Sequence, residues 1–167
     1  LDGIKIYSVA GNVANMLTET GAGVVVAPAA RSYEIISGGT VDAFAGYPLY
    51  SATAFHTAQY AKAVTDIPGQ MSAPSFALFV NKKSWQAISE ADRKIVMDLS
   101  GEAFAARLEA IDQLEAKLRK DVAGQGIPFI EADESLMTAF RTYGKKLRGD
   151  WITTAAELDV DGEAALK

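Results

Sequence analysis

Short strand-like and helix-like segments alternate through the first third of the chain, and this alternation constrains the fold more than any other feature of the sequence. An unbroken β-branched run, Val24–Val26, suits a strand that is buried on both faces. Strand patterns cover residues 4–7, 24–26 and 41–45, and helix patterns cover residues 13–20, 30–37 and a stretch that ends at Phe55. This order predicts an α/β layer with a mostly parallel central sheet flanked by helices.

A long amphipathic pattern dominates the second half. Ser89–Asp92 resembles a capping box, and apolar residues then recur every three to five positions as far as Val122. We expect one helix over residues 90–123, about 50 Å long at 1.5 Å per residue, which is long enough to lie across two domains. Further strands are expected at residues 76–80 and 128–130, with helices from about Glu134 and about Asp150.

Composition excludes several classes of chemistry. The chain has no cysteine, so it forms no disulfide, thiolate nucleophile or cysteine-type zinc site. Its one histidine is His56, and the sequence has no Gly-x-Ser-x-Gly nucleophile motif for which this histidine could act as the general base. We therefore expect His56 to be a solvated surface residue. The net charge of -5 argues against nucleic acid as a partner.

No cofactor or metal is predicted. Asp159 and Asp161 form a short acidic run, but the other positions of a calcium loop are absent. The glycine turns at Gly11-Asn12 and Gly38-Gly39 match neither a phosphate loop nor a dinucleotide fingerprint.

Aromatic side chains follow the predicted strands. Tyr7, Phe44, Tyr47 and Tyr50 lie at the end of a strand or in the loop after it. In an open parallel sheet, ligands bind outside the carboxyl ends of the strands, so these residues are candidate walls of a pocket. The alternative, equally weighted, is that they close the end of the core.

Several motifs resemble those of solute-binding proteins of TRAP transporters, in the same order and spacing. They extend over nearly the whole chain, and they are Leu1–Ile6, Gly21-Ala22, Ser32–Ala43, Leu78–Trp85, Ala91–Lys94, Asp150-Trp151 and Asp161-Gly162. Members of that family have two α/β lobes with the solute enclosed between them. The resemblance implies that residues 1–72 form most of the second lobe, that residues 73–112 belong to the first lobe, and that residues 113–167 return to the second. The long helix then spans both lobes, and most of the first lobe is missing.

The resemblance also implies where the solute binds. This chain departs from the family pattern at several of those positions. Tyr7 stands where many relatives have an arginine that binds the solute carboxylate, so a dicarboxylate or sialic-acid ligand is put in doubt. Ala29 and Gly46 replace a larger phenylalanine and a ligand-binding asparagine, while Arg31 is a candidate for the missing charge. The expected ligand-binding residues are Tyr7, Asn12, Arg31, Phe44, Gly46, Tyr47 and Tyr50.

The expected function is therefore non-enzymatic. By resemblance, the protein is periplasmic after signal-peptide removal, captures a small organic solute and delivers it to TRAP membrane subunits. The solute is expected to be an organic acid, either a monocarboxylate or a less charged, partly apolar compound. Self-association is compatible with the sequence. Two alternatives remain open: an effector-binding domain of a transcription regulator, and an α/β enzyme of unrecognised type.

Overall fold

The computed structural model describes residues 1–69, 71 and 77–167. Its strands are β1 (Lys5–Ser8), β2 (Gly23–Val26), β3 (Ala43–Ala45), β4 (Val64–Asp66) and β5 (Phe129–Glu131). Its α-helices are α1 (Asn12–Glu19), α2 (Ser32–Ser37), α3 (Leu49–Ala54), α4 (Lys82–Ala87), α5 (Glu90–Asp98), α6 (Glu102–Arg107), α7 (Glu109–Gly124), α8 (Glu134–Ala156) and α9 (Gly162–Ala165). Short 3₁₀ turns cover Ala29–Arg31 and Ala58–Tyr60.

The strands form two parallel sheets, which confirms the predicted α/β class. One sheet has the order β2-β1-β3, and β4 pairs with β5 in the other. Among the described strands, β2 lies at an edge and pairs only with β1. Val24 and Val25 are half-buried against the core clusters on opposite faces, so the predicted burial on both faces holds in part for them, whereas Val26 is 52% exposed. The strand β4 was not predicted, since its three residues, Val-Thr-Asp, include only one apolar side chain.

Helices cover the two faces of the β2-β1-β3 sheet. Successive residues of β1 point to opposite faces, and both Ile6 and Tyr7 are buried. Ile6 packs with α1 and with Phe140 and Tyr143 of α8, whereas Tyr7 packs with Ile35 and Ile36 of α2. The central strand thus connects two hydrophobic clusters, one on each side.

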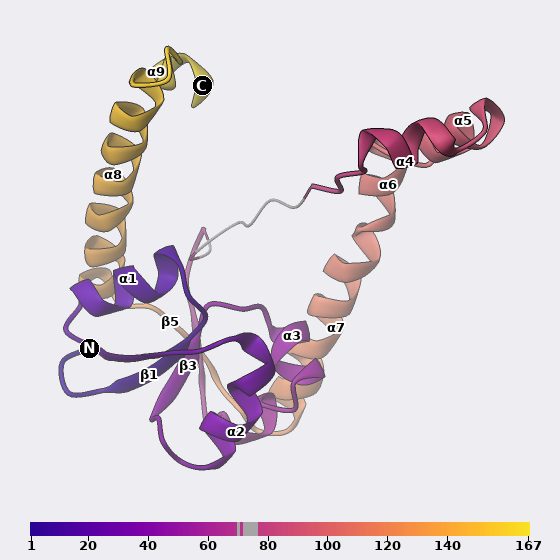
Figure 1. Ribbon diagram of the computed structural model, residues 1–167. Coiled ribbons are helices and arrows are strands. Elements are labelled where there is room, and N and C mark those ends of the chain that lie inside the picture. Colours follow the sequence, from indigo (N-terminus) through magenta and orange to yellow (C-terminus); the bar gives the residue numbers. More distant parts are fainter. Residues whose placement is uncertain (70, 72–76) are drawn as a thin grey trace.

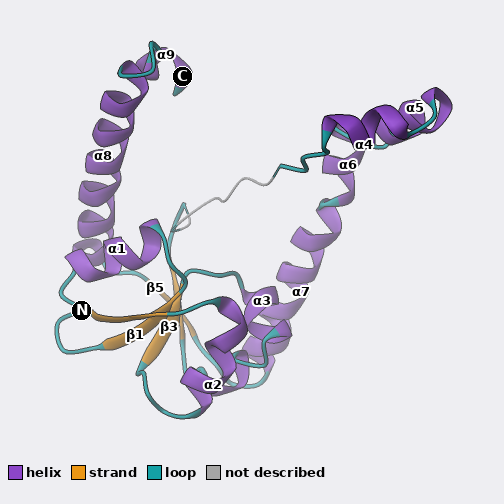
Figure 2. Cartoon of the chain, viewed as in Figure 1, coloured by secondary structure: helices purple, strands orange, loops and turns teal. Residues whose placement is uncertain are grey.

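Two helical arms extend from the sheets in different directions (Figure 1). One arm is α8, which ends at α9 and the C-terminus, and the other comprises α7 and α6 with α4 and α5 at its far end. Figure 2 shows that the strands are confined to the body between the arms. None of the described helices combines the length and the apolarity needed to cross a membrane.

The predicted single helix over residues 90–123 is wrong. It is divided into α5, α6 and α7, and the main break is at Gly101, whose φ of +59° does not occur within a right-handed helix. A smaller interruption at Leu108 separates α6 from α7. The predicted capping residue is confirmed, because the Ser89 hydroxyl accepts a hydrogen bond from the Asp92 amide at 3.1 Å.

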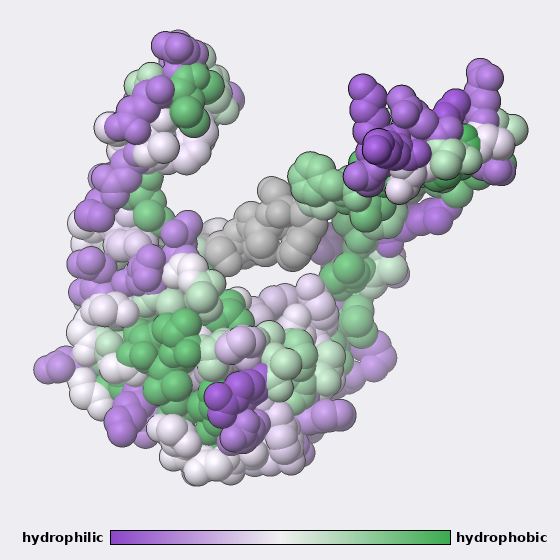
Figure 3. Space-filling model, viewed as in Figure 1, coloured by the Kyte–Doolittle hydropathy of each residue, from purple (hydrophilic) through white to green (hydrophobic). Residues whose placement is uncertain are grey.

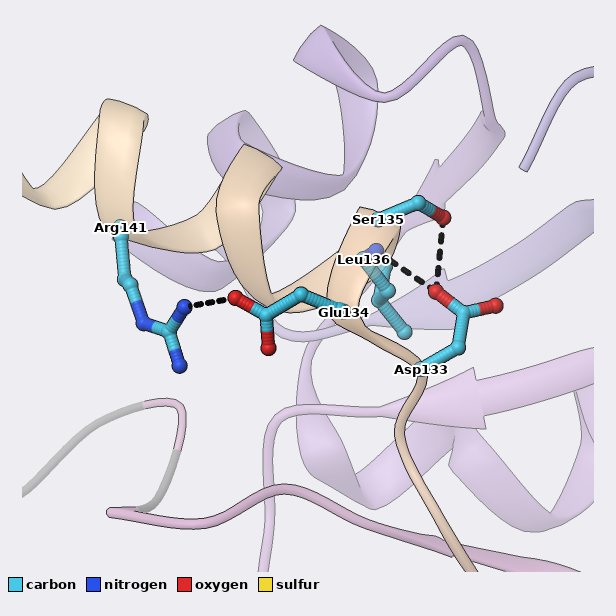
Figure 4. Close-up of polar contacts among 5 residues, drawn as sticks. All are labelled: Asp133, Glu134, Ser135, Leu136 and Arg141. Atoms are coloured by element: carbon cyan, nitrogen blue, oxygen red, sulfur yellow. Dashed lines mark hydrogen bonds and ion pairs between the residues drawn. The ribbon is translucent and has the colours of Figure 1, made fainter.

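The C-terminal region also differs from the prediction. Residues 134–156 form one helix, α8, rather than two segments, because Gly144 and Gly149 are accommodated within it. Its first turn is held by Asp133, which accepts hydrogen bonds from the Leu136 amide at 2.8 Å and the Ser135 hydroxyl at 2.7 Å (Figure 4). These hydrogen bonds, that of Ser135 foremost, lower the pKa of Asp133. At the start of the same helix, Glu134 forms an ion pair with Arg141.

Three further predictions concern residues 76–80, residues 128–130 and His56. The strand expected at residues 76–80 is not formed by residues 77–80, where Leu78 is 93% exposed and no described strand pairs with the chain, and Phe76 lies outside the described residues. The strand expected at residues 128–130 is confirmed as β5. His56 is exposed, as predicted.

Candidate functional site

Aromatic rings gather at the carboxyl ends of β1 and β3. Tyr47, in the loop after β3, stacks on Phe44 with ring centroids 5.9 Å apart and an interplanar angle of 17°. Its ring also meets Tyr7 and Phe55 edge to face, at 6.2 and 6.3 Å. Such offset and edge-to-face contacts stabilise aromatic pairs beyond the area that they bury. We call Tyr7, Phe44, Tyr47 and Phe55 the aromatic cluster.

The hydroxyl of Tyr7 is committed to the protein backbone. Tyr7 is fully buried, and its hydroxyl donates to the carbonyl oxygens of Ala27 and Pro28, each at 3.2 Å. Burial raises the pKa of this phenol, so it stays protonated at neutral pH. Since a phenol has a single hydrogen, Tyr7 has none left to donate to a solute in this conformation.

Tyr47 is bound in a similar way. Its hydroxyl lies 3.1 Å from Oγ1 of Thr57, which in turn donates to the carbonyl oxygen of Ala52 at 3.1 Å. The Thr57 hydrogen is therefore used, and the Tyr47 phenol is the donor of the pair. Burial raises the pKa of Tyr47. The Ser32 hydroxyl is also buried, and it has no hydrogen-bond partner among the described residues.

Gly46 has a steric role. Its φ is +93°, and a Cβ atom at this position would lie 2.8 Å from Oγ of Ser8, which is fully buried. Only glycine adopts this conformation without backbone strain and without displacing the Ser8 side chain. The absence of a side chain at position 46 thus brings the loop of Tyr47 close against the central strand.

Two other predicted residues, Arg31 and Asn12, are not part of the aromatic cluster. Arg31, in the 3₁₀ turn after β2, is exposed and forms a forked contact with Glu34, with N–O distances of 3.3 Å. Asn12 lies at the start of α1 and lines a hollow of about 340 Å³ between α1 and α8, together with Met16 and Tyr143. No group of acidic or histidine side chains suited to a metal ion occurs within the described ranges.

The helix α7 contributes groups that the sequence did not indicate. The amides of Leu49 and Tyr50, at the start of α3, both donate to the Glu115 carboxylate at 2.8 Å. One turn later, Arg119 forms a two-pronged ion pair with Asp66 at the end of β4, and its guanidinium lies 4.1 Å from the centre of the Phe129 ring. The Arg119 hydrogen bond lowers the pKa of Asp66.

This arrangement of parallel strands, with aromatic residues at their carboxyl ends and a helical arm docked beside them, has known counterparts. Residues 1–152 match the family described as bacterial extracellular solute-binding protein, family 7. The chain belongs to this family. The resemblance noted from the sequence motifs is therefore confirmed.

Individual relatives of this family-7 chain agree with the assignment. A protein named outer membrane transporter protein TsaT, from Comamonas testosteroni, is 45% identical over 99% of this chain and 49% of its own length. A TRAP periplasmic solute-binding protein from Bordetella bronchiseptica, with bound (R)- and (S)-mandelate, has 28% identity and a TM-score of 0.81 over 99% of this chain and 52% of its own. A TRAP solute-binding protein from Rhodoferax ferrireducens, in complex with benzoate, has 21% identity and a TM-score of 0.74 over 98% of this chain and 52% of its own. The family-7 chain thus spans about half the length of the relatives that it matches.

Sequence patterns located only part of the aromatic cluster of this family-7 chain. Tyr7, Phe44 and Tyr47 were predicted and do lie together, whereas Tyr50 contacts Glu115 through its backbone amide. Phe55 and Thr57 were missed because they follow α3, where no strand end drew attention to them. Glu115 was also missed, since nothing in a solvated acidic residue of a helix indicates a contact 65 residues away.

Proposed function

We propose that this chain supplies the second lobe, and a part of the first, of a two-lobed solute-binding protein of a TRAP transporter, which encloses an organic acid and delivers it to the membrane subunits. The aromatic cluster at the carboxyl edge of the sheet is the observation that carries the proposal. Ligands of open α/β sheets bind at this edge, and flat rings provide apolar contact area there. The protein acts in the periplasm, after signal-peptide removal, as a binding protein and not as an enzyme.

The apolar surface of the α4–α7 arm supports a two-lobed arrangement. Large exposed apolar residues on this arm are Ile95, Met97, Leu99, Phe104 and Leu108, and the exposed Leu78 and Phe79 lie in the segment that leads into α4. In Figure 3, apolar residues lie along the α6–α7 part of this arm, whereas its far end at α4 and α5 is largely hydrophilic in this view. An exposed set of this size is characteristic of a surface that another domain covers. We propose that the first lobe covers it, with residues 73–112 belonging to that lobe and residues 1–72 and 113–167 to the second.

The chemistry of the cluster favours a solute with an apolar, preferably aromatic, body and one carboxylate. The Tyr7 and Tyr47 hydrogens are already used, so neither phenol donates to an anion. Tyr7 is fully buried and closes the core behind the cluster, whereas the half-buried Phe44 and Tyr47 can offer ring surface. Arg31 is exposed, and its guanidinium already binds a carboxylate, that of Glu34. It is close in sequence to Ala27 and Pro28, whose carbonyl oxygens accept hydrogen bonds from Tyr7. We assign Arg31 to the solute carboxylate. The mandelate bound by the Bordetella bronchiseptica relative has this combination of ring and carboxylate.

A titration tests the proposal. The first lobe of the Comamonas testosteroni relative is joined ahead of Leu1, and calorimetry measures binding of (R)-mandelate, benzoate and succinate. We expect the aromatic acids to bind at least about tenfold more tightly than succinate, whose second carboxylate meets no second cation in the cluster. The isolated 167-residue chain is the control, and it should bind weakly because contacts from the first lobe are lost. Tight binding by the isolated chain, or no organic-acid binding by the two-lobed protein, contradicts the proposal.

A further inference from the structure

The start of α3 is capped from a distant part of the chain. The first amides of a helix have no partner within it, and they are usually satisfied by the side chain of the N-cap residue. Here the N-cap is Pro48, which makes no side-chain cap, and the Glu115 carboxylate of α7 receives the Leu49 and Tyr50 amides instead, each at 2.8 Å. A carboxylate at this place is also favoured by the helix dipole.

The capped turn begins directly after Tyr47. On its other side, Tyr47 follows Gly46, which lies against the buried Ser8. The loop is therefore held at both ends, by the central strand before Tyr47 and by Glu115 just after Pro48. Together these two contacts restrict where the Tyr47 ring lies in the aromatic cluster.

The same helix is also attached to the body by a contact that does not touch this loop. Arg119 lies one turn after Glu115 and binds Asp66 of β4 while covering the Phe129 ring of β5. Residues four apart lie on the same face of a helix, so α7 docks through both contacts side by side. The two contacts use different partners, although the Arg119 charge also attracts Glu115. Replacing Arg119 therefore breaks the docking to Asp66 and leaves the carboxylate that accepts from the α3 amides, which makes Arg119 a control for Glu115.

We propose that Glu115 is a positioning residue for the solute site, coupling the loop of Tyr47 to the arm formed by α4–α7. The inference rests on the proposed function, in which this arm joins the two lobes. A change in the direction of α7 then moves the capped turn of α3, and with it the Tyr47 ring. Since Glu115 occupies the two amides, the solute carboxylate does not bind at the start of α3, and its partner lies elsewhere.

Glu115→Gln is the variant that tests the coupling, with Arg119→Gln as its control. Glutamine keeps the shape of the side chain, but its amide nitrogen cannot accept a hydrogen bond, so one of the two contacts is lost. The first measurement is amide hydrogen exchange in the 167-residue chain, which requires no solute. We expect exchange at Leu49 and Tyr50 to be faster by about tenfold in Glu115→Gln and unchanged in Arg119→Gln.

The second measurement is the affinity of the two-lobed protein for (R)-mandelate. We expect Glu115→Gln to weaken binding by about tenfold, and Arg119→Gln to leave it within about threefold of the unaltered protein, because only Glu115 contacts the loop of Tyr47. Equal losses of affinity in both variants would show that only the docking of α7 affects solute binding, and this would overturn the proposal. Unchanged affinity in Glu115→Gln would also overturn it. If the unaltered protein binds no acid, the proposed function fails, and the exchange rates alone decide whether Glu115 positions the loop.

Discussion

Replacing Gly46 by alanine tests whether the close approach of the Tyr47 loop to β1 is required by the fold. Gly46 has a φ of +93°, and the methyl carbon of an alanine there would lie 2.8 Å from Oγ of Ser8 and 3.5 Å from Cγ1 of Val13. Both neighbours are buried, and the Ser8 hydroxyl donates to the carbonyl oxygen of Val9 at 3.1 Å. The serine can turn away only by giving up that hydrogen bond.

Two contributions set the size of the effect of Gly46→Ala. Placing an alanine at this positive φ costs about 1–2 kcal/mol. Forcing an extra methyl group into a packed site costs about 1–3 kcal/mol more. The expected decrease in the free energy of unfolding is therefore about 2–5 kcal/mol, a large fraction of the roughly 5–15 kcal/mol that stabilises a typical domain.

Urea denaturation of the 167-residue chain, followed by circular dichroism, measures this decrease. Gly126→Ala is the matched control, because Gly126 has a similar φ of +84° but no described atom within 4 Å of the added carbon. The difference between the two variants isolates the contact with Ser8. In a Ser8→Ala background, Gly46→Ala should lose most of that difference. Equal destabilisation by Gly46→Ala and Gly126→Ala would refute the reasoning.

Three further predictions concern charged and phenolic groups. Tyr7→Phe should lower the free energy of unfolding by about 1–2 kcal/mol in urea, since a buried hydrogen bond is lost, yet change (R)-mandelate affinity of the two-lobed protein by less than about threefold. The hydrogen bond with Arg119 lowers the pKa of Asp66 below the ordinary 3.8, so the stability that this carboxylate adds is fully present above that pH and is lost as the pH falls through the lower folded value. Asp66→Asn should therefore reduce the loss of stability in acid, measured by urea denaturation at a series of pH values from neutral to strongly acidic. An unchanged pH profile would contradict the assignment. Arg31→Gln should weaken (R)-mandelate binding by about tenfold or more, whereas Glu34→Gln, which removes a competing carboxylate, should strengthen it; calorimetric titrations in which neither variant differs from the unaltered protein would exclude Arg31 from the site.

Local patterns in the sequence were sufficient for much of the fold. The strand β1, the helix α1 and the cap at Ser89 depend on neighbouring residues, so periodicity and capping rules located them. The break at Gly101 was not predicted, because the apolar stripe continues across it. A stripe reports which face is apolar, and it does not report whether the backbone stays helical.

Contacts between distant residues were decided only by the tertiary structure. The sequence by itself determined the α/β class, the family motifs and the presence of aromatic residues after β1 and β3, because these depend on residue type and local order. Which atoms receive the Tyr7 and Tyr47 hydrogens, and that Glu115 caps α3, depend on segments brought together by packing. A hydrogen bond depends on distances and angles in space, and residue types along a chain do not specify these.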